Sequence, residues 1–441
     1  MTGVQTCALP ICTTRRLLGW LFSRQTLRRL LFICVALVTL VALLYGITNW
    51  RAARAWNNYQ RQLAAQGEKI DWKALIPPPV PDDQNFTMTP FLAPLFDFRP
   101  NRQPGESHWR DTNAVNRLFQ FADNMPGRNG LWERGARHNF GVWIAEYLKH
   151  QTNVPSNLLT LTNKEADRVT AARAVLATLQ EYEPILEELR RASTRPYARF
   201  NIDYSEENPF AILLPHLRVI KMTCRLVDIR ATAALSLGQT ESAFADLKLL
   251  MVLADSLKQE PLLISQLVRW ACLNMGLGVF SEGAADHRWS EAQLKELQAH
   301  FQSVDFLSDY ARTLRAERGA GCTTIEWLQN APYPAQLMSD LVGHNESERE
   351  YMGIRNVLLR LAPRGWFDWE QLNYARTFQE SILPVINVQT RQFNPAHNEL
   401  AQKALKKSFA TPPAANIWEH RFFSRMLLPA LENSHRRMAY G

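Results

Sequence analysis

The sequence lacks the short motifs that mark common catalytic and nucleotide-binding sites. It contains no GxSxG nucleophile elbow, no GxxxxGKS/T phosphate loop and no GxGxxG turn. Its six cysteines show no CxxC spacing, which removes the usual sequence evidence for a metal or redox site. From the sequence we therefore predict no catalytic residue, no cofactor and no metal ligand.

Acidic side chains are absent before Glu68, and this first stretch contains eight arginines. The whole chain has 50 Lys and Arg against 42 Asp and Glu, so removing those eight leaves 42 against 42. The remaining chain is thus formally neutral, whereas a nucleic-acid-binding protein would carry a basic surface on its folded part. We predict no nucleic-acid partner, and the arginine-rich start suits the anionic head groups of a lipid bilayer.

The longest hydrophobic run, Leu30 to Ile47, contains no charged side chain. A helix of this length covers about 27 Å, close to the hydrocarbon thickness of a bilayer. We predict a transmembrane helix over residues 30–48 rather than a buried core helix. A cleaved signal peptide is the alternative, but bulky side chains follow the run where a cleavage site needs small ones. The predicted membrane anchor comprises Leu30, Phe32, Val35, Leu40, Leu44 and Trp50.

The charges that flank this run predict its orientation. Five arginines precede it and three follow closely, which by the positive-inside rule favours a cytoplasmic N-terminus. We expect residues 1–29 to form a basic cytoplasmic tail, with the body translocated across the membrane. Residues 2–11, TGVQTCALPI, resemble the translation of a common sequencing adapter, so they are left out of the fold.

The helical pattern continues beyond the run into a juxtamembrane helix, which we predict over residues 49–76. Residues 77–107 then form a proline-rich arm, with eight prolines between positions 77 and 104. Proline at this density favours extended backbone and opposes helix. The arm is too apolar for a free linker, so we expect it to lie extended across the folded domain; a disordered tether is the alternative.

Helical periodicity dominates the body, residues 108–441. From Leu213 to Ala234 apolar residues alternate four and three positions apart, which indicates one buried helix face. Gly238 suits the left-handed residue that ends such a helix, and a second helix follows over residues 243–257.

A third and a fourth helix continue the series with short connections. Pro261 suits the first turn of the third helix and Gly283 its end, while Ser290 and Gln293 form a capping box for the fourth. Helices joined in this way pack as antiparallel hairpins, so the predicted fold is all-α, a stack of helical hairpins similar to an α-solenoid. Further helical patterns lie near 164–193, 305–329, 346–361, 368–381, 397–409 and 416–438.

Two resemblances accompany these patterns. Residues 231–261, ATAALSLGQTESAFADLKLLMVLADSLKQEP, resemble one tetratricopeptide-type hairpin. The basic tail, the single span, a W-x-x-Y pair, the PPPVPDDQNF arm and the final RFFSRMLLPALENSHRRMA resemble an uncharacterised family of bacterial single-pass membrane-anchored proteins. The second resemblance implies an envelope protein with no known activity, and a further C-terminal segment that this chain lacks.

Two charged clusters could carry chemistry but have simpler explanations. His344 and Glu348 could chelate a divalent ion one helical turn apart, although acidic residues at a helix N-terminus give the same pattern. The glutamates between positions 181 and 188 could act as paired carboxylates. We expect them instead to form ion pairs with Arg190 and Arg191 on an exposed helix face.

Other reactive side chains are expected in the core. His216 begins an apolar helix and is predicted to be a core histidine rather than a base, and Cys224 and Cys272 are predicted to be buried thiols. An aromatic cluster comprises Trp366, Phe367 and Trp369. We predict that it contacts the core or the arm, and a ligand groove is the alternative.

Taken together, the sequence favours a non-enzymatic envelope protein whose anchored body binds another protein or scaffolds a complex. Its expected partners are the lipid bilayer and a protein of the envelope. Two alternatives stay open. One is an envelope hydrolase whose site is assembled from scattered residues, and the other is a domain that binds a lipid or small ligand in a large apolar cavity.

The predicted orientation can be tested with reporter fusions. Alkaline phosphatase, which is active only after translocation, should be active when fused after Gly105, because the arginine bias keeps the N-terminus inside the cell. A fusion after Ser23 serves as the control and should be inactive. An inactive phosphatase after Gly105 would contradict the charge argument.

Overall fold

The computed structural model describes residues 24–99, 108–127, 132, 135–151, 156–163, 166–334, 356–357 and 359–410. Within these ranges nearly all regular structure is helical, so the prediction of an all-α chain is confirmed. The described residues contain one sheet, a short antiparallel pair of β1 (Ile386–Asn387) and β2 (Gln392–Phe393).

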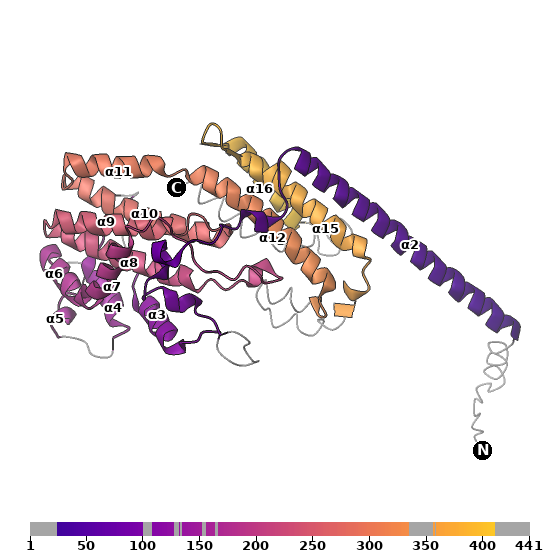
Figure 1. Ribbon diagram of the computed structural model, residues 1–441, viewed down its shortest axis with the longest axis horizontal. Coiled ribbons are helices and arrows are strands. Elements are labelled where there is room, and N and C mark those ends of the chain that lie inside the picture. The colour runs from indigo at the N-terminus through magenta and orange to yellow at the C-terminus, as the bar shows by residue number, and fades with distance from the viewer. Residues whose placement is uncertain are drawn as a thin grey trace, which may run out of the picture.

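Helix α2 (Arg24–Ala65) runs without a break through 42 residues. Its first part projects away from the body (Figure 1), and its most apolar window of 18 residues has no buried part. The helix ends before Gly67, which has a left-handed φ of 77°. The predicted juxtamembrane helix was therefore wrong beyond residue 65, because the chain turns there and Asp71 caps the short helix η1 (Trp72–Leu75).

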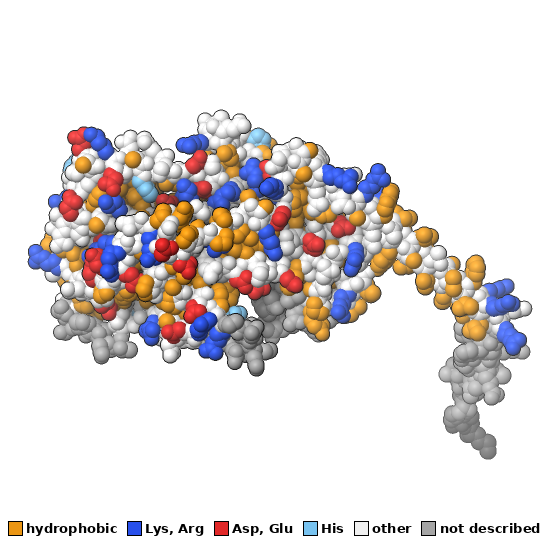
Figure 2. Space-filling view, in the orientation of Figure 1, with side chains coloured by type: hydrophobic (Ala, Val, Ile, Leu, Met, Phe, Trp, Pro, Cys, Tyr) orange, Lys and Arg blue, Asp and Glu red, His pale blue; other side chains and the backbone are white. Residues whose placement is uncertain are grey.

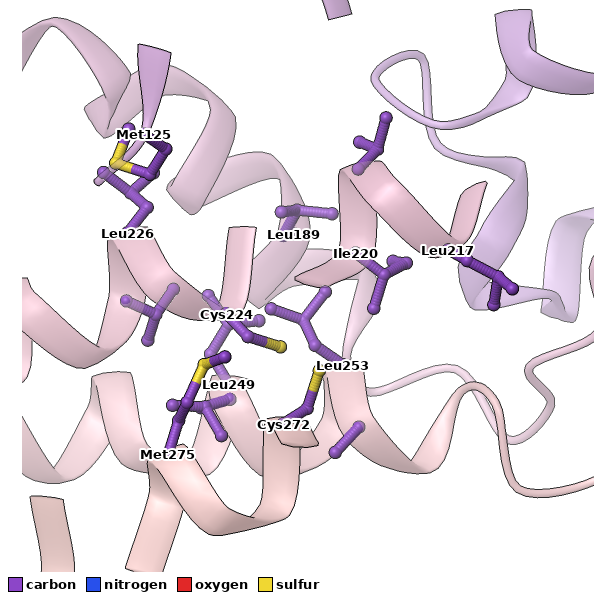
Figure 3. Close-up of a cluster of buried hydrophobic side chains, with 14 of the residues drawn as sticks. Met125, Leu189, Leu217, Ile220, Cys224, Leu226, Leu249, Leu253, Cys272 and Met275 are labelled. Atoms are coloured by element: carbon purple, nitrogen blue, oxygen red, sulfur yellow. The ribbon is translucent and has the colours of Figure 1, made fainter. Parts of the chain in front are cut away.

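Helix α8 (Pro215–Ser236) is the centre of the body, because side chains around nearly all of its circumference are buried. Helices α9 (Thr240–Asp255) and α10 (Leu263–Ala285) pack on α8 and on each other, so the three form a bundle. The turn between α8 and α9 passes through Gly238 at φ 76°, as predicted. Leucine, methionine and cysteine side chains fill the space between the helices (Figure 3).

The boundaries of α10 differ from the prediction at both ends. The helix begins two residues after Pro261 and continues past Gly283. Gly283 does not end the helix but allows the indole of Trp289 to pack against its backbone, since a Cβ there would lie 2.3 Å from that indole. Although α10 is long and apolar enough to cross a membrane, 56% of its most apolar window is buried inside the body. It is a core helix.

Helix α11 (Glu291–Ser303) starts with the capping box predicted from Ser290 and Gln293. The chain then forms α12 (Phe306–Asn330), which packs on α10 at one end and on α15 (Arg364–Thr377) further along. Both α12 and α15 lie beside the second half of α2 (Figure 1).

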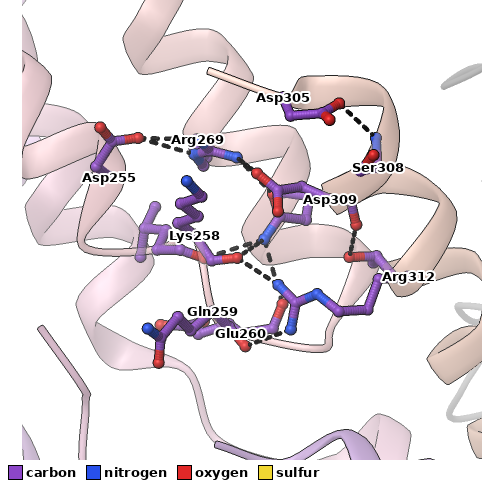
Figure 4. A network of polar contacts seen from close by, with 12 residues as sticks. Asp255, Lys258, Gln259, Glu260, Arg269, Asp305, Ser308, Asp309 and Arg312 are labelled. Carbon is purple, nitrogen blue, oxygen red and sulfur yellow. Dashed lines mark hydrogen bonds and ion pairs between the residues drawn. The ribbon is translucent and has the colours of Figure 1, made fainter. Parts of the chain in front are cut away.

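A buried charge joins the bundle to α12. Arg269 on α10 is completely buried and contacts Asp255 at 2.9 Å and Asp309 at 2.8 Å (Figure 4). Next to it, Arg312 donates to the backbone carbonyls of Lys258 and Gln259 at 2.6 and 3.0 Å. These contacts fix α12 against the turn that leads into α10.

Shorter elements cover the other sides of α8 and complete the chain after α15. They are α3 (Thr112–Asn124), α4 (Phe140–Leu148), α5 (Ser156–Leu159), α6 (Arg168–Leu179), η6 (Gln180–Tyr182), α7 (Glu183–Ala192), η7 (Pro209–Ala211), the π-helix η9 (Phe378–Ile382), η10 (Leu383–Val385) and α16 (Pro395–Ala410).

The proline-rich segment follows η1. Three short 3-10 helices interrupt the extended backbone that its prolines predict, η2 (Asp82–Gln84), η3 (Phe86–Met88) and η4 (Ala93–Phe96). Between them, the side-chain amide of Asn85 donates to the carbonyl of Arg199 at 2.7 Å. The apolar side chains of this segment that belong to the main core are Phe86, Phe91, Leu92 and Leu95.

Candidate functional site

The second half of α2 and the helix α15 lie side by side in a constant register. The Tyr45 hydroxyl donates to the carbonyl of Leu361, and the Gly365 amide donates to Oδ1 of Asn49 at 2.7 Å. Further along, the guanidinium of Arg376 lies 5.4 Å from the ring centre of Tyr59. Each pair is 316 or 317 positions apart in the chain, so the two segments run in the same direction.

An apolar stripe on α2 forms the core of this junction. Ala52, Trp56, Tyr59 and Leu63 are all buried, and their spacing of four, three and four places them on one helix face. Full burial of one large apolar side chain contributes roughly 1.5–3 kcal/mol, so the stripe is a substantial part of the junction's stability. The side chains packed around it include Leu314, Ile325, Leu328, Phe367, Leu372 and Phe378.

A buried ion cluster fixes the turn that follows α2. Glu68 contacts Arg315 at 2.8 Å and Arg318 at 3.0 Å, and Arg318 is completely buried. Burial alone would raise the pKa of Glu68, but the hydrogen bonds and charges of the two arginines outweigh it, so this pKa is lowered. Arg318 also donates to the carbonyl of Lys69 at 2.9 Å and to the side chain of Gln379.

Two glycines permit the close approach of the segments. A Cβ on Gly319 of α12 would lie 2.1 Å from the carbonyl oxygen of Ile70, and a Cβ on Gly365 would lie 2.7 Å from that of Thr48. Neither distance is possible for a real side chain, and both neighbours are backbone atoms that cannot rotate away. The junction therefore requires glycine at both positions.

A cavity of about 430 Å³ opens at this junction. Its described lining contains three carboxylates and no basic side chain, together with the indole of Trp56 and several amides. The carboxylates come from three elements far apart in sequence: Asp71, Glu326 and Asp368. Such a lining suits a positively charged group, which carboxylates bind by charge and an indole by its ring face.

The titration of the cavity's side chains limits its chemistry. The pKa of Asp368 is raised, first by burial and second by the negative charge of Glu326. Burial raises the pKa of the Cys322 thiol to about 12, which keeps it protonated and a poor nucleophile at neutral pH. The arrangement is thus suited to binding, or to proton transfer between carboxyl groups, rather than to thiol chemistry.

The predicted membrane-anchor side chains lie on α2, where all are exposed: Leu30, Phe32, Val35, Leu40, Leu44 and Trp50. Cys224 and Cys272 are buried free thiols, as predicted. His216 is a core histidine, as predicted, since it is completely buried with Nε2 at 2.8 Å from Glu260 and its ring stacked on Phe200.

The glutamates near α7 only partly match the prediction. Arg190 pairs with Glu187 three positions away, but it also reaches the fully buried Asp246 at 2.7 Å. Glu188 accepts a hydrogen bond from the backbone of Phe91 in the proline-rich segment. The face is therefore an internal contact as well as an exposed surface.

Of the aromatic cluster, Trp366 and Phe367 are buried in the junction core, while Trp369 lines a second cavity. The metal candidates His344 and Glu348 lie outside the described residues. Among the residues that the structure does describe, no group of three or more potential metal ligands occurs.

No local sequence pattern indicates the cavity, because its carboxylates meet only when the start of η1, α12 and α15 come together. A scan against models of protein families, a search of curated proteins and a search of solved structures each found no match. The suspected relationship to a family of membrane-anchored helical proteins therefore stays a prediction.

The need for glycine at position 365 can be tested by substitution. Gly365→Ala should destabilise the junction by about 1–3 kcal/mol, because its Cβ forces α15 away from α2. The change should appear as a lower midpoint of thermal unfolding in detergent and faster proteolysis after Ala65. Gly46→Ala on α2 is the matched control, since a Cβ there meets nothing within 4 Å. Equal behaviour of the two variants would contradict the proposed close contact.

Proposed function

We propose that α2 crosses the bacterial inner membrane once, with the N-terminus in the cytoplasm, and holds the body in the periplasm as a non-enzymatic protein-binding domain. One observation carries this proposal: a single unbroken helix is exposed all round over its apolar window, and in its second half it buries one face against the body. An exposed apolar helix of this length is unfavourable in water but suited to lipid. Because this helix is unbroken, the proposed span would also determine how the body is oriented relative to the membrane.

The acidic cavity is the proposed contact point for the partner. It combines Glu326, Asp368 and Asp71 with the indole of Trp56, a set that binds a lysine or arginine side chain by charge and by ring contact. In this arrangement the cavity would lie on the translocated side, because Trp56 follows the end of the apolar run by nine residues, about 14 Å along the helix. We therefore propose a partner that presents a basic side chain close to the bilayer.

A second candidate function rests on two carboxylates that line the same cavity, Glu326 and Asp368. Pairs of carboxyl groups serve as acid and base in many glycoside hydrolases, and the pKa of Asp368 is raised by burial and by the charge of Glu326. This supports hydrolysis of an envelope polysaccharide as the alternative. Turnover of such a substrate that is lost on Asp368→Asn would favour the hydrolase over the binding domain.

The binding proposal is tested by cross-linking in cells, followed by purification of the full chain from detergent-solubilised membranes. The unaltered protein should carry a specific partner, and the double variant Glu326→Gln with Asp368→Asn should recover it at least several-fold less, because the basic group loses its charge partners. Glu291→Gln, which neutralises a highly exposed glutamate on α11, is the control and should retain the partner. Recovery of the unaltered protein alone in every case would contradict the proposal.

A further inference from the structure

The segment that precedes α15 lies at the depth where the apolar run on α2 ends. Leu361 accepts a hydrogen bond from Tyr45, the third residue from the end of that run. With a rise of about 1.5 Å per residue, Tyr45 lies about 3 Å inside the end of the run. If α2 spans the bilayer, the segment around Leu361 therefore lies level with the membrane boundary, as a second part of the chain besides α2.

This place exposes apolar side chains beside basic ones. Val357 and Leu361 are 56% and 62% exposed, and the Leu361 amide donates to the carbonyl of Val357 at 3.0 Å, so they lie one helical turn apart. Arg360 and Arg364 are exposed on the same short stretch. Figure 2 shows hydrophobic and basic side chains together on the end of the body next to the exposed half of α2.

A second cavity lies nearby, between α2 and α15. It has a volume of about 320 Å³ and is lined by Ile47, Thr48, Arg51 and Trp369. Arg51 is exposed and has no ion-pair partner among the described residues. An arginine above apolar side chains, with a tryptophan at the boundary, is the arrangement that fits a phospholipid phosphate and its acyl chain.

We infer that these residues form an interfacial face, comprising Ile47, Arg51, Val357, Arg360, Leu361 and Trp369, which enters the head-group region of the bilayer and binds anionic phospholipid. Arg51 holds the phosphate at the cavity, Arg360 adds positive charge on the same face, and Val357 and Leu361 enter the acyl boundary. The inference rests on the proposed membrane span, because that span sets the depth of the face. Its consequence is that two contacts rather than one fix the tilt of the body on the membrane.

The experiment places an environment-sensitive fluorophore on single cysteines in the full chain, reconstituted into vesicles that contain brominated lipids. Cys7, Cys12 and Cys34 are replaced by serine, and the buried cysteines remain. The label is placed at position 361 to probe the face, at position 44 to probe the span, and at position 294 on α11 as a control on a distant exposed leucine.

The label at 361 should be blue-shifted and quenched by bromine nearly as strongly as the label at 44, whereas the label at 294 should show neither effect. The quenching at 361 should increase several-fold when phosphatidylglycerol is added to phosphatidylcholine, and Arg51→Gln with Arg360→Gln should abolish that increase. Quenching at 44 without quenching at 361 would overturn the inference and leave the span intact. No quenching at 44 would overturn the span itself, and quenching at 361 that ignores lipid charge would overturn the binding of anionic lipid.

Discussion

The contact between the second half of α2 and the pair α12 and α15 is the constraint on which the rest of this molecule depends. It combines a continuous apolar stripe with an ion cluster in which Glu68 holds two arginines. Removal of Glu68 would leave the fully buried Arg318 without its charge partner, and the loss of one member of a buried ion pair commonly costs about 3–5 kcal/mol. The junction thereby holds α2 in one orientation relative to the body. Both cavities are formed where α2 meets the neighbouring helices.

Local sequence patterns were sufficient to predict several of the body's helices, among them α8, α9, α11 and α12. The capping box of Ser290 with Gln293 and the left-handed turn at Gly238 depend on neighbouring residues alone, and both are present. The exposed apolar run of α2 was equally visible, because 18 uncharged residues leave few alternatives. Gly283 misled the prediction, since a glycine that admits a neighbouring tryptophan has the same sequence signature as one that ends a helix.

The junction and its cavity could not be predicted in this way. The pairing of Asn49 with Gly365 joins residues 316 positions apart, and no periodicity within either segment encodes that register. Arg318 and Glu68 also look like ordinary surface charges in sequence, although burial and hydrogen bonds make them internal. The W-x-x-Y pair served only as part of a family resemblance, and the aromatic cluster near residue 366 was predicted only to be a core or arm contact, so neither indicated that these two surfaces meet.

The rigidity of α2 relative to the body is tested most directly by a distance between two spin labels in the full chain, reconstituted into lipid nanodiscs. One label replaces Val38 on the exposed half of α2 and the other replaces Lys403 on α16, with Cys7, Cys12 and Cys34 changed to serine. A docked junction predicts a single narrow distance distribution that broadens on Glu68→Gln. A broad distribution in the otherwise unaltered chain would contradict the account, because α2 would then be a tether and the body free to reorient.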